Sequence, residues 1–156
     1  MKKVLTILGA ILICVIVVGI VVFFGLYYYT SSLDKEAKVY IDEVIPVIVS
    51  SWNPKKLIDH ASPEFLQVFP AKKVELLFGA FSEQMGPLKE YNGATGKVKI
   101  KISPRGKPII IADYLAEAVF KKAPAKIQIQ LIRHNDKWQI VGFRVTVKMK
   151  RRFGSP

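Results

Sequence analysis

The hydrophobic pattern of this chain begins with one unbroken apolar segment and changes its period twice afterwards. From Val4 to Tyr29 no charged residue occurs, a run of 26 residues directly after Met1-Lys2-Lys3. At about 1.5 Å of helical rise per residue the run measures about 39 Å, against about 30 Å for the hydrocarbon core of a bilayer. We therefore predict a transmembrane helix at residues 4–29, behind a cytoplasmic tail of residues 1–3.

Two kinds of cleaved signal compete with this interpretation. A secretory signal has an apolar region of about 7–15 residues followed by small residues at a cleavage site. Here the run is much longer, and only Thr30-Ser31-Ser32 weakly resembles such a site. A lipoprotein signal would use Cys14, but Ile11-Leu12-Ile13 stand where small residues are needed. The pattern therefore favours an uncleaved signal anchor, and the tyrosines at 27–29 suit the membrane interface.

The charges beside this segment predict its orientation. Lys2, Lys3 and the terminal amine precede it, while Lys35 and Lys38 follow a few residues behind it. The flank with more positive charge tends to stay in the cytoplasm. Because each flank has two lysines, the terminal amine and the very short tail decide the prediction in favour of a cytoplasmic N-terminus. We expect a single-pass protein of the cell (inner) membrane whose C-terminal domain is periplasmic or extracellular.

Behind the anchor, apolar residues recur at helical spacing. Ser31 or Ser32 is placed to cap a new helix, and Asn53-Pro54 and Ser62-Pro63 each begin a short one. A fourth helix opens near Pro70 and ends at Gly86-Pro87, because glycine supplies a left-handed cap and proline forbids continuation. The first of these helices presents an apolar face made of Leu33, Ala37, Tyr40, Val44, Ile48 and Trp52.

From residue 97 onward the period changes to two, which predicts β-strands. A strand at 97–102 alternates lysines on an outer face with Val98, Ile100 and Ile102 on a buried face, and a long strand at 109–121 has apolar residues at every even position from Ile110 to Phe120. Asp113 and Glu117 share the odd positions of that strand and should lie on its outer face. Strands at 127–131 and 138–149 follow, with a bulge expected near Gly142. Helices followed by an antiparallel meander predict an α+β fold with the helices on one face of the sheet.

Length and charge limit the remaining possibilities. The 156-residue chain carries a net charge of +12, and without Lys2 and Lys3 the remainder keeps +10. This is enough chain for one domain, predicted at residues 30–149, with a basic C-terminal tail at 150–156. The only cysteine, Cys14, lies in the apolar segment, so the domain needs no disulfide. The positive charge favours anionic partners such as lipid headgroups or wall polymers.

The order of these elements resembles the NTF2-like (cystatin-like) fold, in which helices lie across a curved antiparallel sheet. Three stretches carry the resemblance: Ala61–Phe65, Met85–Lys89 and Asp136–Phe143. They are similar to small membrane-anchored bacterial envelope proteins of that class, most of which have no assigned function. The resemblance covers about residues 33–147, and its motifs are structural, so it implies a fold and carries little chemistry.

Enzymes of this superfamily hold acids, histidines or tyrosines in the cone between helices and sheet, where burial tunes their pKa. In this chain Tyr114 points into the predicted interior and His60 ends a short helix. We name both as cavity candidates, although a core tyrosine and an exposed helix-terminal histidine explain them as well. The sequence contains no phosphate loop, nucleophile elbow or paired metal ligands. We therefore predict no catalytic residue, metal site or cofactor, and the sequence favours a protein that is not an enzyme while leaving an enzymatic cavity open.

The outer sheet face supplies the remaining candidate site. A solvated face of an amphipathic sheet explains its composition, and so does a contact surface for an anion or a partner protein. Nucleic acid is disfavoured because no aromatic residue is interleaved for stacking. Its candidate contact residues are Lys97, Lys99, Lys101, Gln128, Gln130 and Arg144.

Three functions remain open. The sequence favours a non-enzymatic envelope protein whose domain binds a protein partner or assembles with itself, for example as a homodimer. The second hypothesis is a cavity that binds a small apolar ligand or acts in the manner of isomerases and dehydratases. The third is a basic surface that contacts an anionic wall or lipid polymer.

Overall fold

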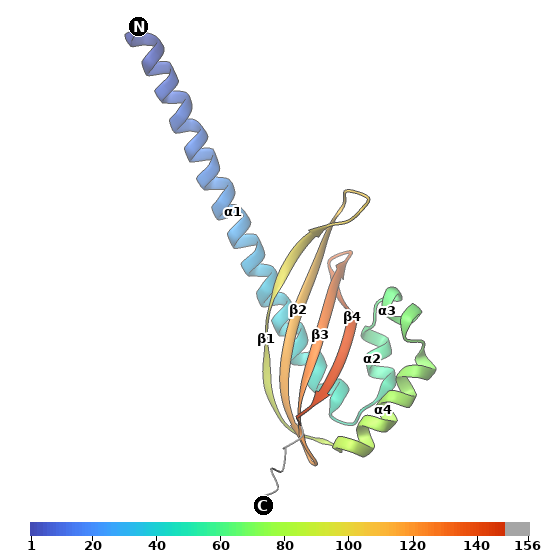
Figure 1. Cartoon of the computed structure of the whole chain (residues 1–156). Helices are drawn as coiled ribbons and strands as arrows, with labels where there is room; N and C mark the ends of the chain where they lie inside the picture. The colour runs from blue at the N-terminus through green and yellow to red at the C-terminus, as the bar shows by residue number, and fades with distance from the viewer. Residues whose placement is uncertain (149–156) are drawn as a thin grey trace, which may run out of the picture. The chain divides into compact units, whose positions relative to one another are not determined.

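The computed structural model describes residues 1–148 and has an α+β fold (Figure 1). It divides into two compact units, Met1–Leu33 and Asp34–Pro156, and the second is called the folded unit below. The predicted basic tail at 150–156 lies outside the described residues. The elements of the described chain are α1 (Lys2–Val49), α2 (Pro54–His60), α3 (Pro63–Val68), α4 (Ala71–Met85), β1 (Leu88–Ile102), β2 (Pro108–Phe120), β3 (Pro124–His134) and β4 (Lys137–Val147).

Helix α1 contains an apolar stretch that is long enough to cross a membrane, judged by length and composition. None of that stretch is buried against the rest of the described chain, so it is not the core helix of a soluble fold. Its exposed side chains include Phe23, Phe24 and the three tyrosines at 27–29.

The prediction of a separate helix capped by Ser31 or Ser32 is wrong, because α1 runs without a break from Lys2 to Val49. No glycine or proline interrupts residues 26–45, and the Thr30 hydroxyl bonds to the carbonyls of Leu26 and Tyr27 within the helix. Asp34 therefore does not sit in a first turn. Its carboxylate instead accepts the backbone N–H of Val98 on β1.

The three shorter helices begin where the local signals predict, and α4 also ends at its predicted stop signal. Asn53 caps α2 by accepting the N–H of Lys55, and Ser62 caps α3 by accepting the N–H of Phe65. Helix α4 ends at Gly86, which has φ of 72°, a left-handed conformation that glycine adopts without strain. These caps fix the turns between helices and so place α2, α3 and α4 beside one another.

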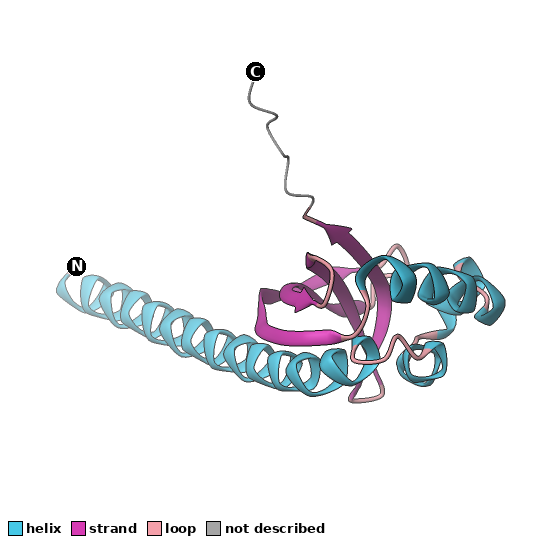
Figure 2. Ribbon diagram, turned by 90° about the horizontal axis from the view of Figure 1, so that it is seen from below, coloured by secondary structure: helices cyan, strands magenta, loops and turns pink. Residues whose placement is uncertain are grey.

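The four strands form one antiparallel sheet in the order β1-β2-β3-β4, as the meander predicts. The sheet is strongly curved (Figure 2). Gln130 pairs with Gly142 while Leu131 pairs with Ile140, so Val141 is the extra residue of the bulge expected near Gly142. Asn135 and Asp136 form the β3–β4 turn with φ of 48° and 61°.

The core of the folded unit lies between α1 and the inner face of the sheet. Even-numbered residues of β2 from Ala112 to Phe120 are buried, as the alternation predicts. The buried face of α1 differs from the prediction, since Ile41 and Ile45 are fully buried while Tyr40 and Val44 are half-buried. At the far end of α1, the ring of Trp52 contacts those of Phe78, Phe81 and Phe120 at 5.0–5.6 Å.

Strand β1 is longer than predicted and its end is uncovered. Val98 is buried, but Ile100 and Ile102 are 44% and 79% exposed. The expectation that these three residues share a buried face is therefore wrong at the hairpin end of the strand. The reason is tertiary, because Asp34, the first residue of the folded unit, reaches β1 at Val98, and the strand continues for four residues beyond it.

Candidate functional site

A hollow of about 380 Å³ lies between α2, α3 and α4 on one side and strand β4 on the other. This volume falls within the range of sites that bind small molecules or peptide side chains. Most of its walls are apolar and come from the three short helices. These helix residues are Leu57, Phe65, Phe69, Val74, Leu77, Phe78 and Phe81, and the sheet adds Gln128, Gln130, Gly142, Phe143, Arg144 and Val145.

The helical wall follows from the spacing of apolar residues on α4. Val74, Leu77, Phe78 and Phe81 recur at intervals of three and four, which places them on one face of the helix. Phe78 contacts Phe143 of β4 with ring centroids 5.9 Å apart, so the helical wall and the sheet wall of the hollow meet at this contact. Leu77 is 40% exposed, so the wall of the hollow remains accessible from solvent.

The opposite wall is the free edge of the sheet. Because β4 is the last strand, it pairs with β3 on one side only. The N–H of Lys148 bonds to the carbonyl of Pro124, and antiparallel pairs alternate between bonded and non-bonded positions. The backbone groups of Phe143, Val145 and Val147 therefore point away from β3, and among residues 1–148 no backbone group bonds to them.

By contrast, the edge of β4 near its start is covered by the α2–α3 connection. The N–H of Ser62 bonds to the carbonyl of Ile140 at 2.8 Å, and Ala61 forms an isolated parallel bridge with the same residue. This contact holds the α2–α3 connection against the strand. The open edge of β4 thus begins on the C-terminal side of the bulge and lies next to the apolar hollow.

Three of the residues predicted on the outer face also line this hollow. Gln128 and Gln130 reach it because Gly142, opposite Gln130, has no side chain. A Cβ at Gly142 would lie 2.9 Å from the Gln130 Oε1 atom, so Gln130 occupies that space. Arg144, opposite Gln128, adds the one charged group among the lining residues. The sequence pattern could not indicate that these residues line the hollow, because this placement depends on the curvature of the sheet at the bulge.

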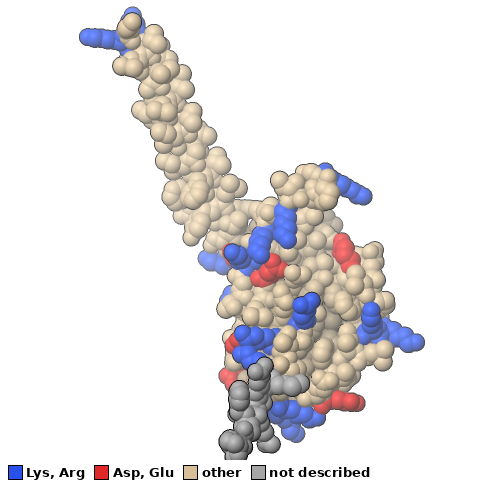
Figure 3. Space-filling view, in the orientation of Figure 1, with Lys and Arg blue, Asp and Glu red and all other residues tan. Residues whose placement is uncertain are grey.

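The rest of the outer face is largely neutralised by its own acids. Asp113 and Glu117 lie there as predicted, and the Lys99 ammonium is 3.0 Å from the Asp113 carboxylate. Lys126 and Lys148 both approach Glu117, at 3.2 and 3.6 Å. Basic and acidic side chains are interspersed on the face seen in Figure 3.

The same ion pairs lower the pKa values of the two acids. Burial by itself raises the pKa of Asp113, but the hydrogen bonds from Lys99 and Gln130 outweigh it and hold the pKa below its ordinary value. The hydrogen bond from Lys126 likewise lowers the pKa of Glu117. Lys97 and Lys101 form no ion pair with described residues, so the unbalanced charge of this face lies toward the β1–β2 hairpin.

The two cavity candidates lie elsewhere in the fold. Tyr114 is 3% exposed in the core, and its hydroxyl donates to the carbonyl of Asp34 at 3.0 Å. Burial raises the pKa of this tyrosine to about 12. His60 is half-buried, and its Nδ1 lies 3.0 Å from the Tyr40 hydroxyl. Neither side chain lines the hollow.

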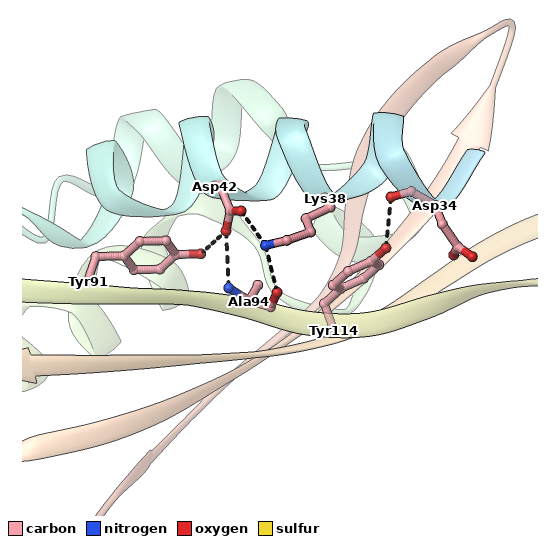
Figure 4. Close-up of polar contacts among 6 residues, drawn as sticks. All are labelled: Asp34, Lys38, Asp42, Tyr91, Ala94 and Tyr114. Atoms are coloured by element: carbon pink, nitrogen blue, oxygen red, sulfur yellow. Dashed lines mark hydrogen bonds and ion pairs between the residues drawn. The ribbon is translucent and has the colours of Figure 1, made fainter. Parts of the chain in front are cut away.

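A second polar cluster joins α1 to β1 (Figure 4). Asp42 accepts the Lys38 ammonium at 2.6 Å, the Tyr91 hydroxyl at 2.9 Å and the Ala94 N–H at 3.1 Å. Burial alone raises the pKa of Asp42, yet these bonds together hold it below its ordinary value. The cluster satisfies its own donors and acceptors, so its role is structural. Asp42 and Tyr91 are 49 residues apart, so no local pattern in the sequence indicates this cluster.

The polar lining of the hollow consists of two amides and a guanidinium, side chains that donate and accept hydrogen bonds. Within residues 1–148 no three His, Cys, Asp or Glu side chains gather to hold a metal ion. Comparisons of the chain with protein-family models, with curated proteins and with solved structures found no match. The resemblance to the NTF2-like class therefore stays a prediction.

Proposed function

We propose that this chain is a single-pass membrane protein whose folded domain binds an extended segment of a partner protein along the open edge of β4. The observation that carries the proposal is the position of that edge. Unpaired backbone groups at Phe143, Val145 and Val147 lie beside an apolar hollow of about 380 Å³. Peptides recognised by strand addition need both features, since backbone bonds give affinity and pockets for alternate side chains give specificity.

The geometry also defines what the bound segment looks like. Side chains of Phe143 and Val145 point to the inner face, opposite Ile129 and Ile127. A strand added next to β4 places alternate side chains on that same face, where the walls of α3 and α4 are apolar. The other set faces Arg144 on the outer side. The segment we expect is therefore extended, apolar at alternate positions, and neutral or acidic at the others.

The location of the domain belongs to the same proposal. The apolar part of α1, residues 4–29, acts as an uncleaved anchor with the N-terminus in the cytoplasm. The domain then works in the periplasm or outside the cell as a non-enzymatic NTF2-like binding module. A second copy of the chain, giving a homodimer, is one partner that this geometry accepts.

A small apolar ligand is the second candidate occupant. The volume of the hollow and its apolar walls favour it, and Gln128, Gln130 and Arg144 supply a few converging polar groups of the kind that orient such ligands. The two candidates differ in one respect. Only the peptide requires the backbone N–H groups of the β4 edge.

The test uses the full chain in its own membrane with a photo-crosslinking amino acid in place of Leu77, which lines the hollow. Its matched control is the neighbouring Leu76, which is 72% exposed but does not line the hollow. Each of the two crosslinker proteins is combined with Val145→Pro, which removes the outward N–H of residue 145 and leaves the β3–β4 hydrogen bonds in place. A matched pair carries Val145→Thr, which keeps this N–H.

A protein adduct that forms at position 77 but not 76, and is lost with Val145→Pro but retained with Val145→Thr, supports strand addition. An adduct that is retained with Val145→Pro contradicts it. Native mass spectrometry of the solubilised full chain addresses the second candidate. A bound small molecule that persists in Val145→Pro identifies the hollow as a ligand cavity instead.

A further inference from the structure

The end of the β1–β2 hairpin has an unusual composition. Residues 97–111 contain five basic residues, five isoleucines and no acid. Ile102 is 79% exposed and Ile100 is 44% exposed, although both have partners in the strand pair, Pro108 and Ile110. Basic side chains gather around the hairpin in Figure 3. Its basic residues are Lys97, Lys99, Lys101, Arg105 and Lys107.

The two most exposed isoleucines lie on the face of the hairpin opposite the three lysines of β1, while Ile109 and Ile111 of β2 share the lysine face. Lys97, Lys99 and Lys101 occupy the outer register, and Ile100 and Ile102 occupy the inner one. Asp113 is the one acid in this part of the outer register; it lies opposite Lys97, and the Lys99 ammonium forms the ion pair with it at 3.0 Å. The end of the hairpin is therefore positively charged and keeps two isoleucines, Ile100 and Ile102, exposed on its inner face.

The position of the hairpin within the folded unit follows from two hydrogen bonds. Asp42 of α1 binds the N–H of Ala94, and Asp34 of α1 binds the N–H of Val98. The chain directions of β1 and α1 are therefore opposite, so the hairpin end of β1 lies toward the N-terminal end of the part of α1 in the folded unit. Asp34 is separated from Tyr29 by only four residues, so the hairpin marks the end of the unit at which the chain arrives from the apolar segment.

We propose that the β1–β2 hairpin binds an anionic lipid surface, with Ile100 and Ile102 entering the interface and the basic side chains meeting the headgroups. Amphipathic elements with exposed aliphatic residues and a basic polar face bind membranes in this way. Each Lys or Arg near an anionic leaflet increases partitioning roughly five-fold at physiological ionic strength. The inference rests on the proposed anchoring of residues 4–29, and it is independent of the β4 site.

Other occupants fit the hairpin less well. No aromatic residue occurs between 97 and 111, so stacking on nucleic-acid bases has no platform. The hairpin end also contributes no residue to the hollow beside β4. A fluid anionic surface requires neither a cavity nor a platform, only exposed aliphatic groups surrounded by positive charge.

The test uses the full chain with Cys14→Ser, reconstituted into vesicles of phosphatidylcholine with or without about one third phosphatidylglycerol, a content chosen to give a strongly negative surface. A fluorescent probe is attached through Ile102→Cys, and quenchers on the acyl chains report its depth. The control probe is attached through Lys122→Cys in the β2–β3 turn, at the opposite end of the sheet. A third protein carries Lys101→Glu and Lys107→Glu together with Ile102→Cys.

We expect strong quenching at position 102 in anionic vesicles, little at 122, and a decrease when salt shortens the screening length from about 8 Å to about 3 Å. The two charge reversals should lower the ratio of bound to free hairpin at least about ten-fold. Equal quenching at both positions, or none at 102, in protein that floats with the vesicles overturns the hairpin proposal while anchoring stands. Protein that does not float with the vesicles refutes the anchor itself and the hairpin proposal with it.

Discussion

The cluster around Asp42 gives the sharpest quantitative prediction, since one carboxylate joins α1 to β1 through several bonds (Figure 4). We consider Asp42→Ala, which removes the acceptor of the Lys38 ammonium, the Tyr91 hydroxyl and the Ala94 N–H. The last two donors are partly buried, so they lose their partner in a place that water reaches poorly.

The magnitude follows from the exposure of each partner. The Lys38 side chain is 51% exposed, and an exposed ion pair of this kind contributes about 0.5 kcal/mol. Each of the two partly buried bonds to a charged acceptor contributes about 1.5 kcal/mol. We therefore expect Asp42→Ala to lower the free energy of unfolding by about 3.5 kcal/mol, Tyr91→Phe by about 1.5 kcal/mol, and Lys38→Ala by less than about 1 kcal/mol.

The pH dependence has a defined sign. The folded pKa of Asp42 lies below the ordinary value of 3.8, so its contribution is complete above that value and is lost as the pH falls through the folded pKa. The difference between the parent protein and Asp42→Ala should be constant from pH 7 to about pH 5 and shrink below pH 4.

The assay is urea unfolding of the full chain in detergent micelles, followed by tryptophan fluorescence. Both tryptophans, Trp52 and Trp138, lie in the folded unit, so the signal reports this unit alone. An Asp42→Ala protein that is no less stable than Lys38→Ala would refute the reasoning. A difference that grows toward acid pH would refute the assigned direction of the pKa shift.

Two further substitutions test the packing against matched controls by the same assay. Gly96→Ala should cost about 3 kcal/mol, because its Cβ would lie 2.1 Å from the carbonyl oxygen of Asp113, whereas Gly79→Ala, in open space on α4, should stabilise by about 0.5–1 kcal/mol. Equal effects at both glycines would contradict the close approach of β1 and β2. Trp52→Phe should cost about 2 kcal/mol, since the indole donates to the Gly86 carbonyl at 2.9 Å inside an aromatic cluster. Trp138→Phe should cost less, because the Trp138 indole N–H is buried without a hydrogen-bond partner among the described residues, and the reverse order would be inconsistent with the structure.

Local signals in the sequence predicted much of the secondary structure correctly. Asn53-Pro54, Ser62-Pro63 and Gly86-Pro87 act within one turn of backbone, so they set the helix ends wherever those helices pack. The same reasoning failed at Ser31 and Ser32, where a good cap residue lies inside a helix that nothing interrupts. A cap stabilises a helix end but does not create one.

The candidate site was predicted only in part. The spacing of Val74, Leu77, Phe78 and Phe81 places them on one apolar face of a helix, but only the structure shows that Leu77 lines an accessible hollow. Gln128, Gln130 and Arg144 were predicted to face outward, and alternation cannot tell an outer face from the rim of a groove. That distinction depends on the bulge at Val141 and on how far α4 stands from β4.

The sequence by itself determined an apolar segment long enough for a membrane, the α+β order of elements, the four-stranded meander and the side on which Asp113 and Glu117 lie. These properties follow from composition, capping and periods of 3.6 and 2, all of which act between near neighbours in the chain. Only the tertiary structure decided that β4 keeps an open edge beside a hollow and that Ile100 and Ile102 stay uncovered. Those features depend on which parts of the sheet are covered by segments that are distant in sequence. The local pattern of residues contains no information on how far that coverage extends.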